Sequence, residues 1–213
     1  MGALNVLAQI DDAHPLFELF RRAGFSVYSW EAIWRFQGIL PGDTSANTWV
    51  EAGPGDENAV RCLFQTLVPP LVQHAEPFAN GAVQRLVYKP KEDVLAYVDI
   101  LTGSAGTCLI PLIHPSVEDV SAILPGLVNR FQQKKKPVYL QVRSYQAWLS
   151  DALEITGAAP SPRFALMVKH LVVGQRNPVI DGVRVRSEQR QAEPTAPIMN
   201  NYNEHGSQTE GIQ

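Results

Sequence analysis

Four residues of this sequence could carry proton-transfer chemistry. His114 lies between an apolar run and Pro115, where a neutral imidazole could take a proton from an attacking amine. Glu118 and Asp119 could act as a base through water, although acids in the first turn of a helix also cap it. Tyr145 could donate a proton if the helix that it begins faces a cleft. A loop histidine, capping acids and a packed tyrosine are the structural alternatives, and the sequence leaves them open.

Composition and motif content argue against several classes of function. The net charge of −3 argues against a nucleic-acid partner, which a basic face would favour. Cys62 and Cys108 fit no zinc spacing, and their apolar neighbours favour buried thiols in a reducing compartment. No nucleophile-elbow serine or Walker-type loop occurs, no apolar run reaches the roughly 18 residues of a membrane span, and no secretory signal is present. We therefore expect a cytoplasmic protein with no metal, nucleic-acid or membrane partner.

The first 38 residues predict a strand, a helix and one or two further strands. Residues 4–10 are apolar and end at two aspartates, which is typical of a buried strand. A helix is expected to begin near Pro15 and to end at Gly24. Its apolar face repeats at intervals of three and four residues: Leu16, Leu19, Phe20 and Ala23. Residues 25–36 are rich in aromatic and apolar side chains, which favours strand structure.

Residues 47–173 predict a longer series of elements. We expect strands at 48–51, 81–88, 94–101, 107–113, 137–142 and 164–173, and helices at 56–67, 71–78, 116–131 and 144–156. Pro111 indicates an edge or a bulge in its strand. Ser116 and Asp119 approximate a capping box at a helix start, and Pro125 with Gly126 predicts a kink in that helix.

Two breaks divide the chain. The turn-rich residues 39–46 read as a linker after residues 1–38, which are too few to fold alone. Residues 174–213 lose apolar periodicity and predict a disordered tail.

An internal repeat offers one interpretation of this division. Residues 4–36 and 138–170 share the order strand, helix, glycine, strand at an offset of 133 residues, which matches Gly24 with Gly157. Chance similarity of generic elements is the alternative. Taken as a repeat, residues 1–38 are the C-terminal fragment of a first domain and residues 47–173 are a second copy.

The order of elements in 47–173 resembles the GNAT superfamily of N-acetyltransferases. Residues 137–149, Pro-Val-Tyr-Leu-Gln-Val-Arg-Ser-Tyr-Gln-Ala-Trp-Leu, are similar to the fifth strand of that family and its following helix. Residues 20–25, Phe-Arg-Arg-Ala-Gly-Phe, resemble the family signature aromatic-x-x-x-Gly-Phe. We therefore predict an α+β fold with a GNAT-like mixed, mainly antiparallel sheet flanked by helices, preceded by a partial second copy (strand-helix-strand).

The resemblance implies an acetyl-CoA-dependent N-acyltransferase that acts on a small-molecule or peptide amine. The backbone of Leu112 and Ile113 would then contact the cofactor and polarise its thioester carbonyl. His114 and Tyr145 are the residues that could serve as base and acid.

The chain departs from the family where the cofactor should bind. The family loop has the form Gln/Arg-x-x-Gly-x-Gly/Ala, whose glycines and free N–H groups hold a pyrophosphate. Residues 113–119 contain no glycine, but they contain Pro115 and two acids. The tyrosine that often protonates the leaving thiolate in this family is replaced by Phe20 in the first copy and Leu153 in the second. The alternative prediction is therefore a catalytically inactive module that acts in packing or partner binding, including as a homodimer.

Overall fold

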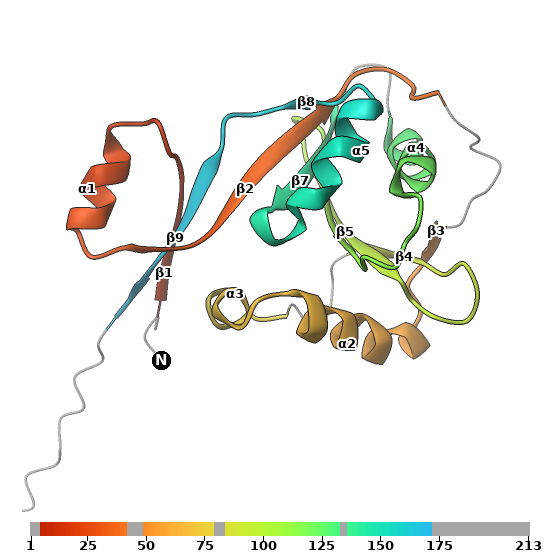
Figure 1. Ribbon diagram of the computed structural model, residues 1–213, viewed down its shortest axis with the longest axis horizontal. Coiled ribbons are helices and arrows are strands. Elements are labelled where there is room, and N and C mark those ends of the chain that lie inside the picture. The colour runs from red at the N-terminus through yellow and green to blue at the C-terminus, as the bar shows by residue number, and fades with distance from the viewer. Residues whose placement is uncertain (1–4, 42–48, 79–83, 133–135, 172–213) are drawn as a thin grey trace, which may run out of the picture. The chain divides into compact units, whose positions relative to one another are not determined.

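The structure is a computed structural model that describes residues 5–41, 49–78, 84–132 and 136–171 (Figure 1). Its elements in chain order are β1 Asn5–Asp11, α1 Leu16–Arg22, β2 Ser26–Phe36, β3 Trp49–Glu51, η1 Pro54–Asp56, α2 Glu57–Leu67, α3 Pro70–Ala75, β4 Gln84–Tyr88, β5 Ala96–Thr102, β6 Thr107–Ile113, α4 Val120–Phe131, β7 Val138–Arg143, η2 Ser144–Leu149, α5 Ser150–Ile155, β8 Ala159–Pro160 and β9 Phe164–His170. The predicted tail and residues 42–46 of the predicted linker lie outside the described residues.

A single sheet joins the described strands in the order β1-β9-β2-β7-β6-β5-β4-β3, with β8 paired to β2. Among these strands, β6 and β7 form the one parallel pair, and the other pairs are antiparallel. The prediction of a mixed, mainly antiparallel sheet flanked by helices is confirmed.

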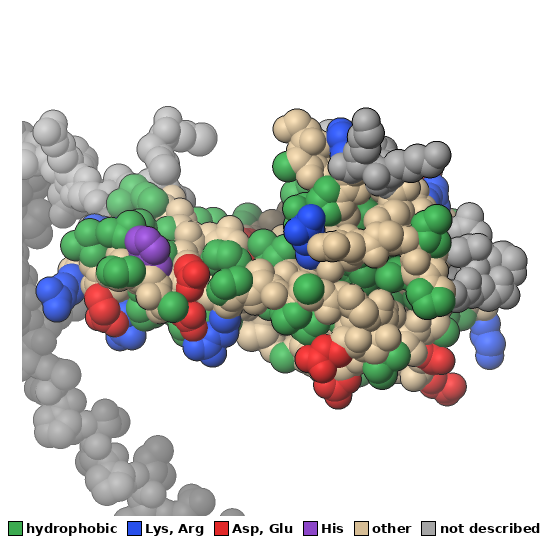
Figure 2. All heavy atoms as spheres, turned by 90° about the horizontal axis from the view of Figure 1, so that it is seen from above, with side chains coloured by type: hydrophobic (Ala, Val, Ile, Leu, Met, Phe, Trp, Pro, Cys, Tyr) green, Lys and Arg blue, Asp and Glu red, His purple; other side chains and the backbone are tan. Residues whose placement is uncertain are grey.

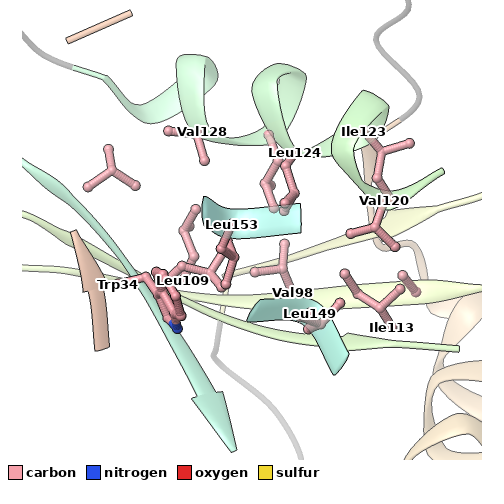
Figure 3. Close-up of a cluster of buried hydrophobic side chains, with 14 of the residues drawn as sticks. Trp34, Val98, Leu109, Ile113, Val120, Ile123, Leu124, Val128, Leu149 and Leu153 are labelled. Atoms are coloured by element: carbon pink, nitrogen blue, oxygen red, sulfur yellow. The ribbon is translucent and has the colours of Figure 1, made fainter. Parts of the chain in front are cut away.

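Helices cover both faces of the sheet (Figure 1). On one face α2 and α3 enclose a core that includes Val60, Val72 and Val87. On the other face α4 and α5 enclose a second core, drawn in Figure 3, which includes Leu124 and Leu153. Among the described helices, none is long and apolar enough to cross a membrane.

The start of α4 differs from the predicted capping box. Asp119 itself is the residue that caps the helix, because its Oδ1 atom accepts the Ala122 N–H at 3.0 Å. Ser116 lies outside the helix and hydrogen-bonds to His114 instead. The helix then continues through Pro125 to Phe131.

The single helix predicted at 144–156 is wrong in its first half. Residues 144–149 form the 3₁₀ segment η2, and an α-helix begins at Ser150. Gln146 leaves the helical region, with φ −118° and ψ 24°, because its side chain bonds to the backbone of β6.

The N-terminal segment completes the sheet and does not stand apart as a separate domain. β2 lies between β7 and β9 and pairs with both, so residues 1–173 form one compact unit. The expected division between 1–38 and 47–173 is therefore not seen. Leu40, in the expected linker, is held by α4, since its N–H and C=O both bond to the Asn129 side chain at 2.8 and 3.0 Å.

The two segments of the predicted repeat interleave within this sheet. β1 pairs with β9, with Asn5 opposite His170, and β2 pairs with β7, with Phe36 opposite Val138. Adding the repeat offset to Asn5 gives Val138, and subtracting it from His170 gives residue 37. The first pair therefore corresponds to Val138 and residue 37, which differs by one residue from the second pair. Each strand of one segment thus pairs with a strand of the other, although a partial second copy as a domain is not confirmed.

Apolar side chains are exposed around α1 and β1. No residue of α1 is buried, and Leu16, Leu19, Val6 and Leu7 are 44%, 57%, 40% and 47% exposed. In Figure 2 hydrophobic side chains gather over this part of the described chain. Exposed apolar groups of this kind favour contact with another surface.

Candidate functional site

Strands β6 and β7 diverge along their length. Their parallel pairing covers Thr107 to Leu109 on β6 and Val138 to Leu140 on β7. Beyond this point β6 continues to Ile113 and β7 to Arg143 without pairing to each other. This divergence explains Pro111, predicted at an edge or bulge, because the N–H that proline lacks would face a side of β6 where the ladder has ended.

Gln146 closes the gap that the divergence leaves. Its Oε1 atom accepts the Ile113 N–H at 2.8 Å, and its Nε2 atom donates to the Pro111 carbonyl at 2.8 Å. The side-chain amide therefore satisfies β6 as a neighbouring strand would. Gln146 is 2% exposed, so the contact excludes water.

A cleft of about 180 Å³, here called the Tyr145 cleft, opens beside this gap on the face that α2 and α3 cover. Its lining residues are Phe64, Val68, Val72, Glu76, Pro77, Phe78, Tyr97, Asp99, Ile110, Pro111, Leu112, Arg143 and Tyr145. Two carboxylates and one guanidinium are the charged groups among them. Asp99 is paired with Arg85, with 3.0 Å between Oδ2 and Nη2.

Arg143 connects the cleft to a buried group of polar side chains. Its Nε atom lies 3.2 Å from Oε2 of Glu31, and its Nη2 atom lies 2.9 Å from Oε2 of Glu76. Glu31 is fully buried and also accepts hydrogen bonds from Gln9 and Gln141. Burial lowers the pKa of Arg143, but the Glu76 and Glu31 carboxylates outweigh it and the net pKa is raised. Arg143 therefore stays charged.

Tyr145, predicted as a proton donor, lines the cleft. Burial raises its pKa to about 12, with Arg143 opposing the shift. Its hydroxyl therefore stays protonated at neutral pH and can donate a hydrogen bond. Burial also raises the pKa of Tyr97, the second cleft tyrosine. These groups suit binding of a polar ligand better than release of a proton.

His114, predicted as a base, lies elsewhere. It lines a cavity of about 320 Å³ that also contains Cys62 and Asp93. Its Nδ1 atom lies 2.6 Å from the Ser116 hydroxyl and accepts the Ser116 N–H at 3.1 Å. Neither cavity contains both predicted residues. Within the described ranges no three His, Cys, Asp or Glu side chains are arranged to hold a metal ion.

The backbone of Leu112 and Ile113, predicted to contact the cofactor, is already engaged. The Ile113 N–H donates to Gln146. The His114 N–H donates to Leu95 on the β5 side at 2.8 Å, and the alternation of strand hydrogen bonds therefore turns the Leu112 N–H toward β5 as well.

The residues at the start of α4 do not fit a pyrophosphate either. Asp119 Oδ1 accepts from the Ala122 N–H at 3.0 Å and from the Ser121 hydroxyl at 2.6 Å. These hydrogen bonds, from Ser121 first, hold the pKa of Asp119 below its usual range. A carboxylate therefore occupies the helix terminus where an anion would bind, and it would repel a phosphate. Acetyl-CoA does not fit the residues present here in the manner that the resemblance implies.

Sequence reasoning missed the residues that dominate this site. Glu31 and Glu76 are isolated acids in apolar surroundings, and Gln146 belongs to an ordinary-looking helix start. A lone acid within a strand-forming aromatic run was the one available signal, because buried acids are rare without a partner.

The fold is similar to two solved structures, one of which is assigned to an acetyltransferase family. A protein assigned to the GNAT acetyltransferase family from Novosphingobium aromaticivorans DSM 12444 superposes with a TM-score of 0.53 at 12% identity, covering 79% of this chain and 75% of that one. A conserved protein of unknown function from Staphylococcus epidermidis ATCC 12228 gives a TM-score of 0.50 at 12% identity, covering 79% and 73%. No protein-family model and no curated protein matches the sequence. This chain therefore has the GNAT acetyltransferase fold, and identity this low establishes the fold alone.

Proposed function

We propose that this chain is a non-catalytic module with the acetyltransferase fold, which binds an amine-bearing small molecule or peptide in the Tyr145 cleft. The observation that carries the proposal is the Gln146 side chain, which occupies the backbone groups of β6 at Pro111 and Ile113. An acyl-CoA arm would have to displace an amide that is buried and makes two hydrogen bonds of good length. The Asp119 cap at α4 adds a second obstacle, since it would oppose a phosphate.

The chemistry of the cleft lining favours a cation. Glu76 and Asp99 against Arg143 give the lining a formal charge of −1. The rings of Phe64 and Tyr145 add surfaces on which an ammonium group is attracted, and the Arg85 guanidinium already lies over the rings of Phe78 and Tyr97, 4.9 Å from each centroid. An amine attached to an apolar body therefore suits the cleft.

Calorimetry with two ligands tests this proposal on the full chain. Acetyl-CoA should give no binding heat, whereas benzylamine should bind with a dissociation constant of about 1 mM or tighter, which is reasonable for a ligand of its size. Asp99→Asn should weaken benzylamine binding several-fold. The control Asp93→Asn changes an exposed acid of another cavity and should have no effect.

The divergence of β6 and β7 in a GNAT fold supports a second candidate, an N-acyltransferase acting on the same amine. Saturable binding of acetyl-CoA to the wild-type chain would favour this candidate and reject the non-catalytic module. Absence of benzylamine binding would reject the amine cleft under both candidates.

A further inference from the structure

A further cavity shares Arg143 with the Tyr145 cleft. This cavity, here called the Trp34 cavity, has a volume of about 270 Å³. It is lined by Trp30, Glu31, Ala32, Trp34, Val142, Arg143, Ser144, Ala147, Ser150 and Arg163. These residues come from β2, β7, the segment 144–150 and the loop before β9. The volume is just below the range of roughly 300–1,000 Å³ for drug-sized ligands, so it suits a molecule with one ring.

Two donors among the lining residues lack an acceptor. In the described part of the chain, three buried side-chain nitrogen or oxygen atoms have no hydrogen-bond partner, and two of them are Trp34 Nε1 and Arg143 Nη1. Trp34 is 4% exposed, and in Figure 3 its indole nitrogen lies on the side of the ring away from α4. Buried donors without a partner are rare in folded proteins and call for an explanation. A ligand that brings an acceptor oxygen supplies one when the Trp34 and Arg143 side chains shift to admit it, since solvent reaches neither nitrogen in this structure.

The walls of the cavity favour a planar body. Trp30 and Trp34 both contribute indole rings. The Arg163 guanidinium lies over the Trp30 ring, with 4.3 Å from Cζ to the ring centroid. Flat aromatic surfaces of this kind accept another ring in stacked or edge-on contact.

The charges of the cavity favour an anion. Arg143 and Arg163 against Glu31 give the lining a formal charge of +1, opposite in sign to the Tyr145 cleft. The Glu31 carboxylate is already bonded to Arg143, Gln9 and Gln141. Arg163 pairs with Asp12, with its Nη2 and Nε atoms 2.6 and 2.7 Å from Oδ2, and 62% of its side chain is exposed.

We propose that the Trp34 cavity binds a small aromatic carboxylate, with the ring between the indoles and the carboxylate accepting from Trp34 and the arginines. The inference does not rest on the amine cleft, because the two cavities share only Arg143 among their lining residues.

Indole N–H signals in an NMR titration of the full chain test this proposal. Benzoate should shift the Trp34 signal and saturate with a dissociation constant of about 1 mM or tighter. Trp34→Phe removes that signal, which assigns it, and should weaken benzoate binding several-fold because one charge-assisted hydrogen bond is lost. Trp148→Phe removes a tryptophan that is 41% exposed and outside the lining, so its benzoate affinity should equal that of the wild type.

A cavity-filling variant separates this site from a nonspecific effect. Ala147 is exposed and lines the cavity, so Ala147→Phe should fold normally and abolish benzoate binding while benzylamine binding to the Tyr145 cleft persists. Ser150 also lines the cavity, so Ser150→Leu provides an independent variant that should block benzoate binding. The proposal is wrong if benzoate leaves the Trp34 signal unmoved at about 20 mM. It is equally wrong if benzylamine shifts that signal as much, or if both filled variants bind benzoate as the wild type does.

Discussion

The Nε atom of Arg143 lies 3.2 Å from Oε2 of Glu31, a carboxylate with no solvent-exposed side-chain surface. Glu31 belongs to β2 and Arg143 to the end of β7, and the two residues lie opposite each other in the register of that strand pair. The ion pair therefore joins the N-terminal segment to the rest of the sheet. It also lies between the two cavities, since Arg143 lines both.

Removal of Arg143 should destabilise the whole sheet. Arg143→Met leaves the buried Glu31 carboxylate without its counter-charge, and breaking one partner of a buried pair costs about 3–5 kcal/mol. Urea unfolding followed by circular dichroism measures the loss. The control Glu57→Gln breaks the exposed Arg61–Glu57 pair and should change stability by less than about 0.5 kcal/mol. Equal stability of the two variants would show that the buried pair does not join the segments.

Gln146 should protect the end of β6. Gln146→Ala leaves the buried Ile113 N–H and Pro111 C=O without partners, and two such groups together cost about 2–4 kcal/mol. Hydrogen exchange of the Ile113 amide should accelerate in the variant. The Leu112 amide, on the β5 side of the same strand, is the internal control. Its exchange should accelerate only as much as the global loss of stability requires. Unchanged exchange at Ile113 would mean that water replaces the amide without loss.

Gly106 should be required where β6 and β7 begin to pair. Its φ is +150°, and an added Cβ atom would clash with the carbonyl oxygen of Pro137. That carbonyl accepts the Thr107 N–H at 3.2 Å, next to the first residue pair of the parallel ladder. Gly106→Ala should therefore lower the unfolding free energy by roughly 1–3 kcal/mol. Gly103→Ala is the matched control, because its nearest atom beyond its neighbours lies 4.0 Å away and its φ is not positive. A similar loss in both variants would contradict the explanation.

The sequence predicts the elements of this fold better than it predicts their partners. Periodicity and glycine positions place α1, α2 and β5 to within a few residues, because those signals are local. The position of β2 inside the sheet depends on pairing with β7 and β9, which are more than a hundred residues away along the chain. A turn-rich segment after residue 38 looks like a domain boundary whether or not the strand before it returns to the same sheet.

The candidate site shows the same limit. Tyr145 lines the Tyr145 cleft, whereas His114, its partner in the prediction, lines another cavity. Gln146 follows Tyr145 directly, and its role depends on the divergence of two strands that no local pattern encodes. The missing glycines and the acids at 118–119 predict poor pyrophosphate binding, and the Asp119 cap adds a carboxylate at the helix terminus that is consistent with this prediction.

Tyr145 should make the protein less stable in alkali. Its folded pKa is about 12, and an unfolded tyrosine has a pKa of about 10. Below pH of about 10 both states hold the proton, so the residue has no pH-dependent effect there. As the pH rises from about 10 to about 12, the unfolded state releases its proton first and the free energy of unfolding falls, by up to about 1.4 kcal/mol per pH unit for one such group. The free energy of unfolding of the Tyr145→Phe variant should fall less steeply in that pH window.

The measurement is urea unfolding at a series of pH values between about 9 and 11, with wild type and variant compared at each pH. Tyr97 also has a raised pKa, so the variant should retain part of the alkaline fall. Absorbance near 295 nm gives an independent readout, since Tyr145→Phe should remove one tyrosine from the late-ionising group and leave the early-ionising group unchanged. Parallel stability curves for the two proteins would mean that the Tyr145 hydroxyl is not buried in solution.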